Sequence, residues 1–487
     1  MDPSFSYWLG FGLYGVLVIF IGFYIWIKEK HQHKESDNQV FWQAGRNLSG
    51  IAVGLSISAS MMSVSWSGVY GVQLFYWFGP GGAWLLIIPW LITMAGFFIM
   101  APVFRKIHAF SQPALLTRRF GDKARKYLVL PLIFVFITWT GAEIYAAGII
   151  ISPLLQISLP VTLFLISLIV AAYSFTGGFE AVVSTDKIQF VLIALFMIIM
   201  VGIGINALPE NLSIMNYPVP PKINSKSSLL GPGLALILIT FMAYLPGWLT
   251  ETDVWVRMQA ARSDREARKG IGIAAINSFL FVGVLPMIIG LCALILYPPS
   301  GENVNTTLGE GELIFTTMMK NHASEWLSVL LSVGLIAAAM STIDTCSNIV
   351  ALTLSHDWLE PKLKNRWNAR QLNHLARLIS AAAVFISFIY ALFTKSLWDI
   401  FYLSSGVLTT TVFIPVVSSF IKSTKRIQVL LAVIAGFSAT FIFYFLELKG
   451  FLQNFEPAFI RETELGYILW GFLFSLAGFI SGRFLKD

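Results

Sequence analysis

The sequence predicts an all-α polytopic membrane protein with thirteen membrane-spanning helices, in which helices 2 to 11 form two inverted repeats of five helices. Composition is the first reason, because 56% of the 487 residues are hydrophobic and only 12% are charged, against about 25% charged residues in soluble domains. The second reason is that apolar runs of about 20 residues recur, which is the length that crosses a bilayer. The third is that two of these runs, five helices apart, are interrupted.

The apolar runs place the expected helices along the chain. The core helices occupy about 48–421, and the peripheral helices are 7–27, 427–446 and 464–484. No long polar insertion separates the runs, so we expect a single transmembrane domain over residues 1–487. The segment between helices 8 and 9 carries a short surface helix near Leu313–Lys320. All thirteen spans are expected at approximately 7–27, 48–77, 80–104, 127–153, 158–174, 179–207, 229–255, 271–297, 325–354, 372–394, 398–421, 427–446 and 464–484.

The distribution of Lys and Arg predicts the direction of the helices. With the N-terminus outside, 26 basic residues fall in cytoplasmic loops and 6 in the opposite loops, as the positive-inside rule requires. Arg257 is counted among the cytoplasmic residues, in the loop after helix 7. We therefore expect a multi-pass protein of the cell (plasma or inner) membrane with a cytoplasmic C-terminus. The net charge of +7 needs no nucleic-acid partner, and we expect a monomer surrounded by lipid.

The two cysteines give no sign of a disulfide framework or a metal cluster. Cys292 and Cys346 both fall in apolar segments. They show none of the spacings that mark a disulfide framework or a metal site.

The second and seventh helices carry the interruptions. From Gly54 to Gly71 the sequence reads GLSISASMMSVSWSGVYG, and such small hydroxylated residues satisfy freed backbone groups and allow close helix packing. From Phe241 to Asp253 it reads FMAYLPGWLTETD, where Pro246 removes a backbone donor and breaks the helix. Interrupted spans at corresponding positions of inverted repeats flank the substrate and ion sites of many transporters, although Gly and Pro are frequent in membrane helices in general.

The segment between helices 5 and 6 carries a family resemblance. YSFTGGFEAVVSTDKIQF, from Tyr173 to Phe190, resembles the signature of the sodium–solute symporter family. RMQAARSDREARKG and FWQAGRNLSG are similar to the family's stretches after the seventh helix and before the second. The resemblance implies the leucine-transporter-type fold, with helices 2 to 11 as the inverted-repeat core. The signature positions matched are Tyr173, Gly177, Gly178, Phe179, Ala181, Thr185, Asp186 and Gln189.

A polar stripe in helix 9 suggests a cation site. The segment AAAMSTIDTCSN places Ala338, Ser341, Thr342 and Thr345 on one helix face, where hydroxyls supply oxygen ligands without a full counter-charge. AMST also resembles the family's sodium-binding stretch, as ASMM does in helix 2. The resemblance implies hydroxyl ligands from Ser341 and Thr342. It also implies backbone carbonyl ligands from Ala338, Ala59 and Met62. The alternative is that these hydroxyls only bond to the preceding turn of their own helix.

A second sodium site is a further candidate. Some family members use an acid on helix 6 with hydroxyls on helix 9, and Asp186, Ser341 and Thr345 occupy matching positions here. Asp344 stands where another hydroxyl is expected, so it either strengthens cation binding or holds a proton. Asp186 also has a simpler explanation, because an acid in the first turn of a helix interacts favourably with the helix dipole.

Candidate solute-binding residues are an intramembrane acid and several aromatic side chains. Glu143 is the deepest acid outside the polar stripe, and intramembrane acids are functional candidates. No Lys or Arg is expected mid-membrane in helices 2, 4, 7 or 11, which favours a neutral, zwitterionic or cationic solute over a carboxylate. Sugar-transporting relatives carry a gating tyrosine where Leu249 stands, so sugar-like and amino-acid-like solutes both remain open. The aromatic candidates, which stack on a sugar ring or face a cation, are Trp66, Tyr70, Trp139, Tyr244, Trp248 and Tyr402.

These features together predict a sodium-coupled symporter that imports a small polar organic solute by alternating access, with sodium as its ion. A proton-coupled symporter of the same fold is the main alternative, with Asp344 or Glu143 as the proton carrier. A remote alternative is an intramembrane aspartyl enzyme that uses Asp186 and Asp344 as a paired-acid dyad. We expect a transporter and not an enzyme.

Overall fold

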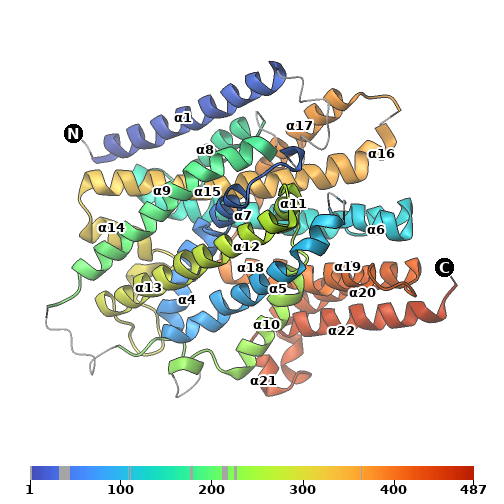
Figure 1. Cartoon of the computed structure of the whole chain (residues 1–487). Coiled ribbons are helices and arrows are strands. Elements are labelled where there is room, and N and C mark those ends of the chain that lie inside the picture. Colours follow the sequence, from blue (N-terminus) through green and yellow to red (C-terminus); the bar gives the residue numbers. More distant parts are fainter. Residues whose placement is uncertain are drawn as a thin grey trace.

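The structure is a computed structural model of the whole chain. It describes residues 3–31, 44–107, 109, 111–175, 179–210, 218–223, 228–363 and 365–486. In these ranges the protein is built from helices, and β-type pairing is limited to two isolated bridges, Leu48 with Ala261 and Ser300 with Asn303. The long helices run along one common direction, and the two chain ends lie at opposite ends of the bundle (Figure 1).

The uninterrupted spans follow the expected apolar runs. They are α1 (Pro3–His31), α5 (Ile87–Lys106), α7 (Val129–Leu155), α8 (Leu159–Ser174), α9 (Phe179–Asn206), α15 (Glu325–Ala351), α17 (Ala369–Phe393), α20 (Arg426–Leu448) and α22 (Gly466–Ser481). Helix α1 lies at one edge of the bundle, and α20 packs on α22 at another (Figure 1).

Four further spans are built from several pieces. The second span consists of α3 (Gly50–Met61), η3 (Val64–Tyr70) and α4 (Gly71–Phe78), and the seventh consists of α10 (Leu234–Trp248) and α11 (Thr252–Ala260). The others are α12 (Asp264–Ser278), η8 (Phe279–Val284) and α13 (Leu285–Leu296), and then α18 (Leu397–Val407), η11 (Leu408–Phe413) and α19 (Ile414–Ser418).

Short helices connect the spans. The expected surface helix is confirmed as α14 (Ile314–His322), and α6 (Gln112–Phe120) lies at the other end of the bundle (Figure 1). The remaining short helices are η2 (Ala44–Arg46), η4 (Gly79–Leu85), η5 (Asp122–Lys126), η7 (Ser228–Leu230), η9 (Thr306–Gly311), η10 (Leu352–Leu359), α16 (Glu360–Leu363), η12 (Phe451–Asn454), α21 (Ala458–Arg461) and η13 (Gly482–Phe484).

Length and composition confirm the multi-pass, all-α class. Ten helical segments in the described ranges are long and apolar enough to cross a membrane, or eleven if the bent pair α10 and α11 is one span. Two shorter apolar helices, Gly50–Met61 and Leu159–Ala172, accompany them. The segment Val64–Lys106 counts once although it holds the end of the second span and the whole third. The count of thirteen therefore stays a prediction.

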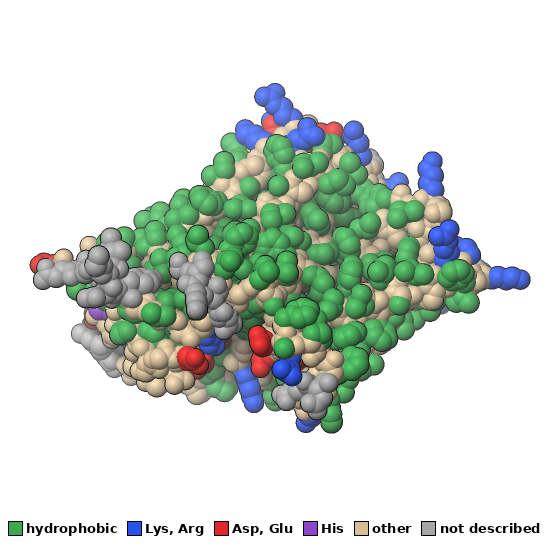
Figure 2. All heavy atoms as spheres, turned by 90° about the horizontal axis from the view of Figure 1, so that it is seen from below, with side chains coloured by type: hydrophobic (Ala, Val, Ile, Leu, Met, Phe, Trp, Pro, Cys, Tyr) green, Lys and Arg blue, Asp and Glu red, His purple; other side chains and the backbone are tan. Residues whose placement is uncertain are grey.

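The outer surface matches a lipid environment. Hydrophobic side chains cover the broad middle of the molecule, and Lys and Arg gather along the rims (Figure 2). Large apolar side chains such as Leu13, Ile99 and Phe393 are 63%, 69% and 78% exposed. Such a continuous apolar surface is the mark of a membrane-facing protein and not of a soluble monomer.

The interior contrasts with this surface, because many buried side chains near the interrupted spans are polar. Ser56, Glu143, Asp186 and Gln259 are fully buried. Buried polar groups are costly unless they are hydrogen-bonded, so the network around them defines the candidate site.

Helices α3 and α12 are closely joined near the start of the second span. A Cβ atom at Gly270 would lie 2.6 Å from Cγ1 of Val53, so glycine is needed for the approach of the two helices. The backbone of Leu48 adds two hydrogen bonds, from its N–H to the Ala260 carbonyl at 2.9 Å and from the Arg262 N–H to its carbonyl at 3.0 Å. The Gly50 N–H donates to the Glu266 carboxylate.

Candidate functional site

The first break lies in the second span, between α3 and η3. Met62 leaves helical geometry (φ −81°, ψ 52°), and Ser63 is extended and accepts a hydrogen bond from the Trp66 N–H through its hydroxyl at 2.8 Å. The last four carbonyls of a helix have no intrahelical partner, and in α3 these include the carbonyls of Ala59 and Ser60. The break therefore exposes carbonyl oxygens in the middle of the bundle, at the negative end of a helix dipole.

Helix α15 faces these carbonyls with the polar stripe. The Thr342 hydroxyl donates to the Ser60 carbonyl at 3.1 Å, and the Ser341 hydroxyl donates to Oδ1 of Asp186 at 2.6 Å. Ala59, Met62 and Ala338 are all buried. Thr342 thus lies against the end of α3 in the stretch that holds Ala59 and Met62. The contact brings the two halves of the expected sodium site to one place, where carbonyl and hydroxyl oxygens are the donors that a hard cation takes.

A buried arginine is the most prominent group that the sequence analysis did not find. Arg257 was assigned to a cytoplasmic loop, but it lies in α11 inside the broken seventh span and is only 1% exposed. It pairs with Asp253 of its own helix and, at 3.2 Å, with Asp186 of α9. The spacing of four residues between Asp253 and Arg257 was the available signal, because it allows an ion pair on one helix face.

Arg257 also connects α11 to two other helices. Its Nε donates to the Ser56 hydroxyl of α3 at 2.7 Å, and a terminal nitrogen donates to the Thr345 hydroxyl of α15 at 2.9 Å. The Ser56 hydroxyl in turn donates to the Asp186 carboxylate. Asp186 and Thr345 are therefore close together, as expected for a second cation site. The positive charge that they surround is the guanidinium of Arg257.

Asp344 lies in a different environment from Asp186. Its Oδ1 accepts a hydrogen bond from the Ser174 hydroxyl of α8 at 3.0 Å and from the Asn348 amide of its own helix at 3.4 Å. The two acids thus bond to different helices, and the bond from Ser174 to Asp344 joins α8 to α15.

A cavity of about 60 Å³ lies between the two breaks. Four of the seven candidate solute residues line it, namely Trp66, Trp139, Glu143 and Trp248. The wall also contains Trp90, Phe136, Phe401, Cys346, Met61 and the polar residues Ser60, Ser63, Ser65, Thr342, Ser405, Glu251 and Asp253.

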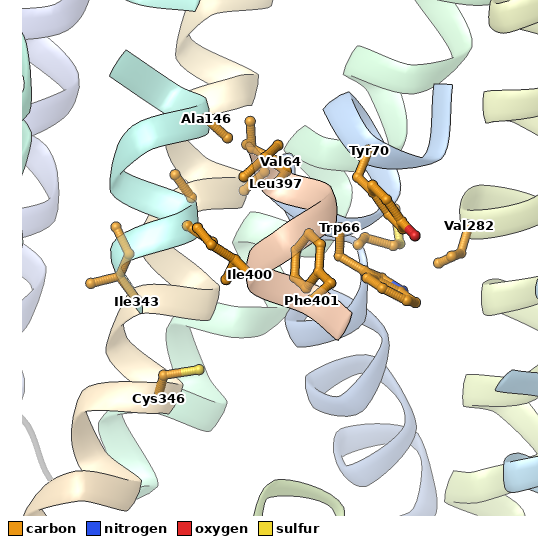
Figure 3. Packing of buried hydrophobic residues seen from close by; sticks show 14 of the residues in the cluster. Val64, Trp66, Tyr70, Ala146, Val282, Ile343, Cys346, Leu397, Ile400 and Phe401 are labelled. Carbon is orange, nitrogen blue, oxygen red and sulfur yellow. The ribbon is translucent and has the colours of Figure 1, made fainter. Parts of the chain in front are cut away.

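The other three candidates, Tyr70, Tyr244 and Tyr402, lie behind the cavity wall in one aromatic stack. The ring centroids of Tyr244 and Trp248 are 4.2 Å apart, and those of Tyr244 and Tyr402 are 5.1 Å apart. The hydroxyls of Tyr70 and Tyr244 are 3.3 Å apart. Figure 3 shows Trp66 and Tyr70 side by side with Phe401 of α18 turned toward them. The aromatic stack and the cavity wall therefore share Trp66 and Trp248.

Glu143 of α7 closes the first break. Its carboxylate accepts hydrogen bonds from the N–H groups of Val64 and Ser65, both at 3.2 Å, and from the Ser65 hydroxyl at 2.5 Å. These N–H groups begin η3, where a helix leaves its first donors unpaired and carries a partial positive charge. Glu143 therefore fills the anion-binding end of the broken helix with a carboxylate of the protein itself.

The second break has a different arrangement. Helices α10 and α11 meet at an angle of 40°, and Gln112 of α6 bridges the break. Its amide donates to the Thr250 carbonyl and accepts from the Thr252 hydroxyl at 2.6 Å.

Glu251 precedes α11 at this break and was also missed by the sequence analysis. It is 3% exposed, lines the cavity, and its side chain makes no capping bond. The available signal was its place a few residues after Pro246, which lies inside α10 just before that helix ends at Trp248.

A second, larger cavity of about 600 Å³ is lined by residues of α4, of η9 and of the start of α18. Lys222 Nζ lies there 3.5 Å from the centroid of the Trp77 ring and 3.7 Å from Oε2 of Glu310. Burial lowers the pKa of Lys222, and the charge of Glu310 opposes the shift. Burial raises the pKa of Glu312, which accepts a hydrogen bond from the Tyr145 hydroxyl at 3.0 Å.

Transition-metal chemistry has no site in the part of the chain that the structure describes, since no group of three or more His, Cys, Asp or Glu is placed to hold a metal ion. Cys292 and Cys346 are both buried and free.

Comparison with known proteins identifies relatives over most of the chain. A family model described as the sodium:solute symporter family matches residues 41–436. The sodium/glucose cotransporter 1 of Sus scrofa is 25% identical over 389 residues, which is 71% of this chain. The chain thus spans only 57% of that relative's length.

Two shorter bacterial relatives are covered more fully. The sodium/glucose cotransporter of Vibrio parahaemolyticus is 25% identical over 78% of this chain and 74% of its own length. The high-affinity proline transporter of Bacillus subtilis (strain 168) is 24% identical over 71% of this chain and 74% of its own length.

Among solved structures, a Na⁺-coupled sialic acid symporter in a substrate-bound, outward-open state aligns with a TM-score of 0.75 at 19% identity. The match covers 100% of this chain and 98% of that one. This likeness shows a shared fold.

Proposed function

The chain belongs to the sodium:solute symporter family, and on that premise we propose that it is a sodium-coupled symporter which imports a small polar organic solute by alternating access. The observation that carries the proposal is the contact between Thr342 and the Ser60 carbonyl at the first break. A sodium ion held there by Ala59, Met62, Ala338, Ser341 and Thr342 would join α15 to the end of α3. Such an ion favours the conformation in which these elements meet, and this differential affinity is what coupling requires.

The energetics are adequate with one sodium ion. Entry of one charge down about 100 mV releases about 2.3 kcal/mol, and a tenfold sodium gradient adds about 1.4 kcal/mol. Together these sustain roughly 500-fold accumulation of a neutral solute.

Arg257 supports a stoichiometry of one. Its guanidinium already contacts Asp186 and Thr345, two members of the candidate second sodium site, and supplies the positive charge there itself. We expect the sodium dependence of uptake to be hyperbolic, with a Hill coefficient near one. A coefficient near two would contradict this assignment.

The test of the proposal is uptake in proteoliposomes, with sodium replaced by potassium at fixed pH. Accumulation should require sodium and should be lost in the double variant Ser341→Ala, Thr342→Ala. Ser332→Ala is the matched control, because this hydroxyl lies on the same helix and, among the described residues, bonds only to the Val329 carbonyl of its own helix. Sodium-independent uptake that follows pH would contradict the proposal and favour proton coupling.

The aspartyl-enzyme alternative finds no support in the geometry. Asp186 is bonded to Arg257, Ser341 and Ser56, whereas Asp344 is bonded to Ser174 and Asn348. A catalytic dyad requires two carboxyl groups that share a proton.

We further propose that the protein acts as one monomeric domain in the plasma membrane, surrounded by lipid, with a small-molecule partner and no nucleic acid. The N-terminus would be outside and the C-terminus cytoplasmic. The two ends of the chain lie at opposite ends of the bundle (Figure 1), and the basic loop residues still fall mostly on the cytoplasmic side when Arg257 is left out of the count. Both observations support this orientation.

A further inference from the structure

The cavity between the two breaks carries more acid than its surroundings neutralise. Three of the residues that line it are acids, Glu143, Glu251 and Asp253, and none of its lining residues is Lys, Arg or His. Charges buried in this way need a partner. We therefore compare the partners of the three acids, because an acid without one indicates a charge that the solute would supply.

Two of the acids are already satisfied by the protein. Glu143 accepts two backbone N–H groups and the Ser65 hydroxyl. Asp253 pairs with Arg257 and accepts from the Ser60 hydroxyl at 3.0 Å. Both carboxylates are therefore held by donors that belong to the fold.

Glu251 is the exception. Its side chain has no hydrogen bond and no ion pair among the described residues, although the residue is only 3% exposed. Arg257 attracts it only at longer range, since the guanidinium is already bonded to Asp186 and Asp253. Of the three cavity acids, Glu251 is thus the one without a bonding partner among the described residues.

Aromatic rings form much of the remaining wall. The Trp66 ring lies 5.2 Å from Trp248 and 4.9 Å from Phe401, centroid to centroid, and Trp90 lies 5.4 Å from Trp248. The indole N–H groups of Trp90 and Trp139 are used outside the cavity, in bonds to Ser278 at 3.0 Å and to Ser404 at 2.7 Å. These rings therefore offer the cavity apolar and π surface, which attracts organic cations.

The first break also disfavours one class of solute. In broken-helix transporters the N-terminus of a half-helix binds the substrate carboxylate, but Glu143 occupies that position here. A solute carboxylate would have to displace it, and would then share the cavity with the Glu251 carboxylate.

From these steps, and resting on the proposed function, we infer that the transported solute is a compact organic cation, an amine or quaternary ammonium without a carboxylate. Its positive group lies against the Glu251 carboxylate and the faces of the cavity tryptophans. The volume of about 60 Å³ limits the bound group to a small headgroup.

Equilibrium binding to the purified full-length chain in sodium-containing buffer tests the inference. The probes are radiolabelled choline and ethanolamine, each in competition with its uncharged isostere in which carbon replaces the ammonium nitrogen. We expect at least one of the two cations to bind about tenfold or more tightly than its isostere. Equal affinity of cation and isostere for both pairs would overturn the inference, and this comparison needs no variant.

Substitution of the acid then locates the site. Glu251→Gln should lower the preference for the cation severalfold, leaving the part that the tryptophan faces supply, and Glu251→Asp should lower it less. Glu456→Gln is the matched control, because it removes another buried carboxylate that lies outside the cavity and accepts from Trp470. If the Glu251→Gln protein keeps the full preference for the cation, the assignment is overturned. The assignment is also overturned if this variant loses only the pH dependence of uptake, because Glu251 would then be a proton site.

Binding in sodium or potassium, together with the uptake assay in proteoliposomes, separates this inference from the proposed function. If the cation binds equally in sodium and in potassium, sodium coupling fails and the cation site stands. If sodium-driven uptake is found for a neutral sugar or an amino acid and for neither cation, the coupling stands and the cation site is overturned.

Discussion

The two broken spans solve the same problem in opposite ways. At the first break a neighbouring helix supplies a carboxylate, Glu143, which saturates the N–H groups that begin η3. At the second break the neighbouring helix supplies a neutral amide, Gln112, and the break's own acid, Glu251, is left facing the cavity. The comparison teaches that a broken helix does not by itself define a substrate's charge. The charge that the site accepts depends on whether the protein's own side chains fill the exposed helix end or leave it open to a ligand.

Arg257 connects the two breaks, and its removal should have the largest effect. Arg257→Met leaves Asp186 and Asp253 buried without their counter-charge, so we expect a loss of about 3–5 kcal/mol in the free energy of unfolding. Thermal unfolding in detergent measures it. Arg262→Met is the control, since that side chain is 58% exposed and its pair with Glu266 is expected to contribute less than about 1 kcal/mol. Equal stability of the two variants would mean that the network does not hold the breaks together.

Removal of the carboxylate at the first break should come next. Glu143→Ala leaves two buried N–H groups unpaired, and we expect a loss of about 3 kcal/mol together with loss of uptake. Glu143→Gln keeps an acceptor and should lose less. If both variants are as stable as the unmodified protein, Glu143 does not stabilise the first break, and the contrast drawn between the two breaks is wrong.

The amide at the second break should matter less, because its hydrogen bonds are between neutral groups. Gln112→Ala removes the bonds to Thr250 and Thr252, and we expect a loss of about 1–2 kcal/mol. The same unfolding assay shows which of the two variants loses more stability. A larger loss for Gln112→Ala than for Glu143→Ala would mean that the neutral amide stabilises its break more than the carboxylate does.

Glu312 extends the comparison to a partly exposed site and should show the smallest effect. Its carboxylate accepts from the N–H of Leu397, at the start of α18, at 3.4 Å, so it too lies at a helix N-terminus. Burial raises its pKa from the ordinary 4.5. As the pH rises from that value to the raised one, the unfolded chain loses its proton first, and stability falls.

Relative to Glu312→Gln, the unmodified protein should therefore lose stability between about pH 4 and about pH 8, by less than about 1 kcal/mol. Thermal unfolding of both proteins at the two pH values measures the difference. A gain in stability over this range would mean that hydrogen bonding, and not burial, dominates at Glu312.

The sequence was sufficient for the features that depend on local pattern. Apolar runs predicted the spans, and the Ser-rich stretch marked the first break. Pro246 marked the second break only approximately, because α10 continues through it and ends at Trp248. The polar stripe placed Ser341 and Thr342 where they contact Asp186 and the Ser60 carbonyl. These features follow from periodicity and backbone chemistry within one segment.

The sequence was not sufficient where partners are distant in the chain. Arg257 lies beyond the apolar part of its span, so its burial depends on Asp186 of α9 and Ser56 of α3, which only the fold brings near. Glu143 was chosen as a solute residue because it is a deep acid, but its partners at the first break are visible only in three dimensions. Glu251 was missed because a run of polar residues after a proline looks like the end of a helix.

The junction of α3 with α12 has a mechanical consequence. Glycine at position 270 lets the helices touch, and the Leu48 and Gly50 backbones fasten the same pair to the 260–266 segment. The two helices cannot separate without breaking these hydrogen bonds, so they should move together as one rigid body when the cavity opens. Because α3 ends at the first break and the bonded segment follows α11 at the second, this rigid body is connected to both breaks.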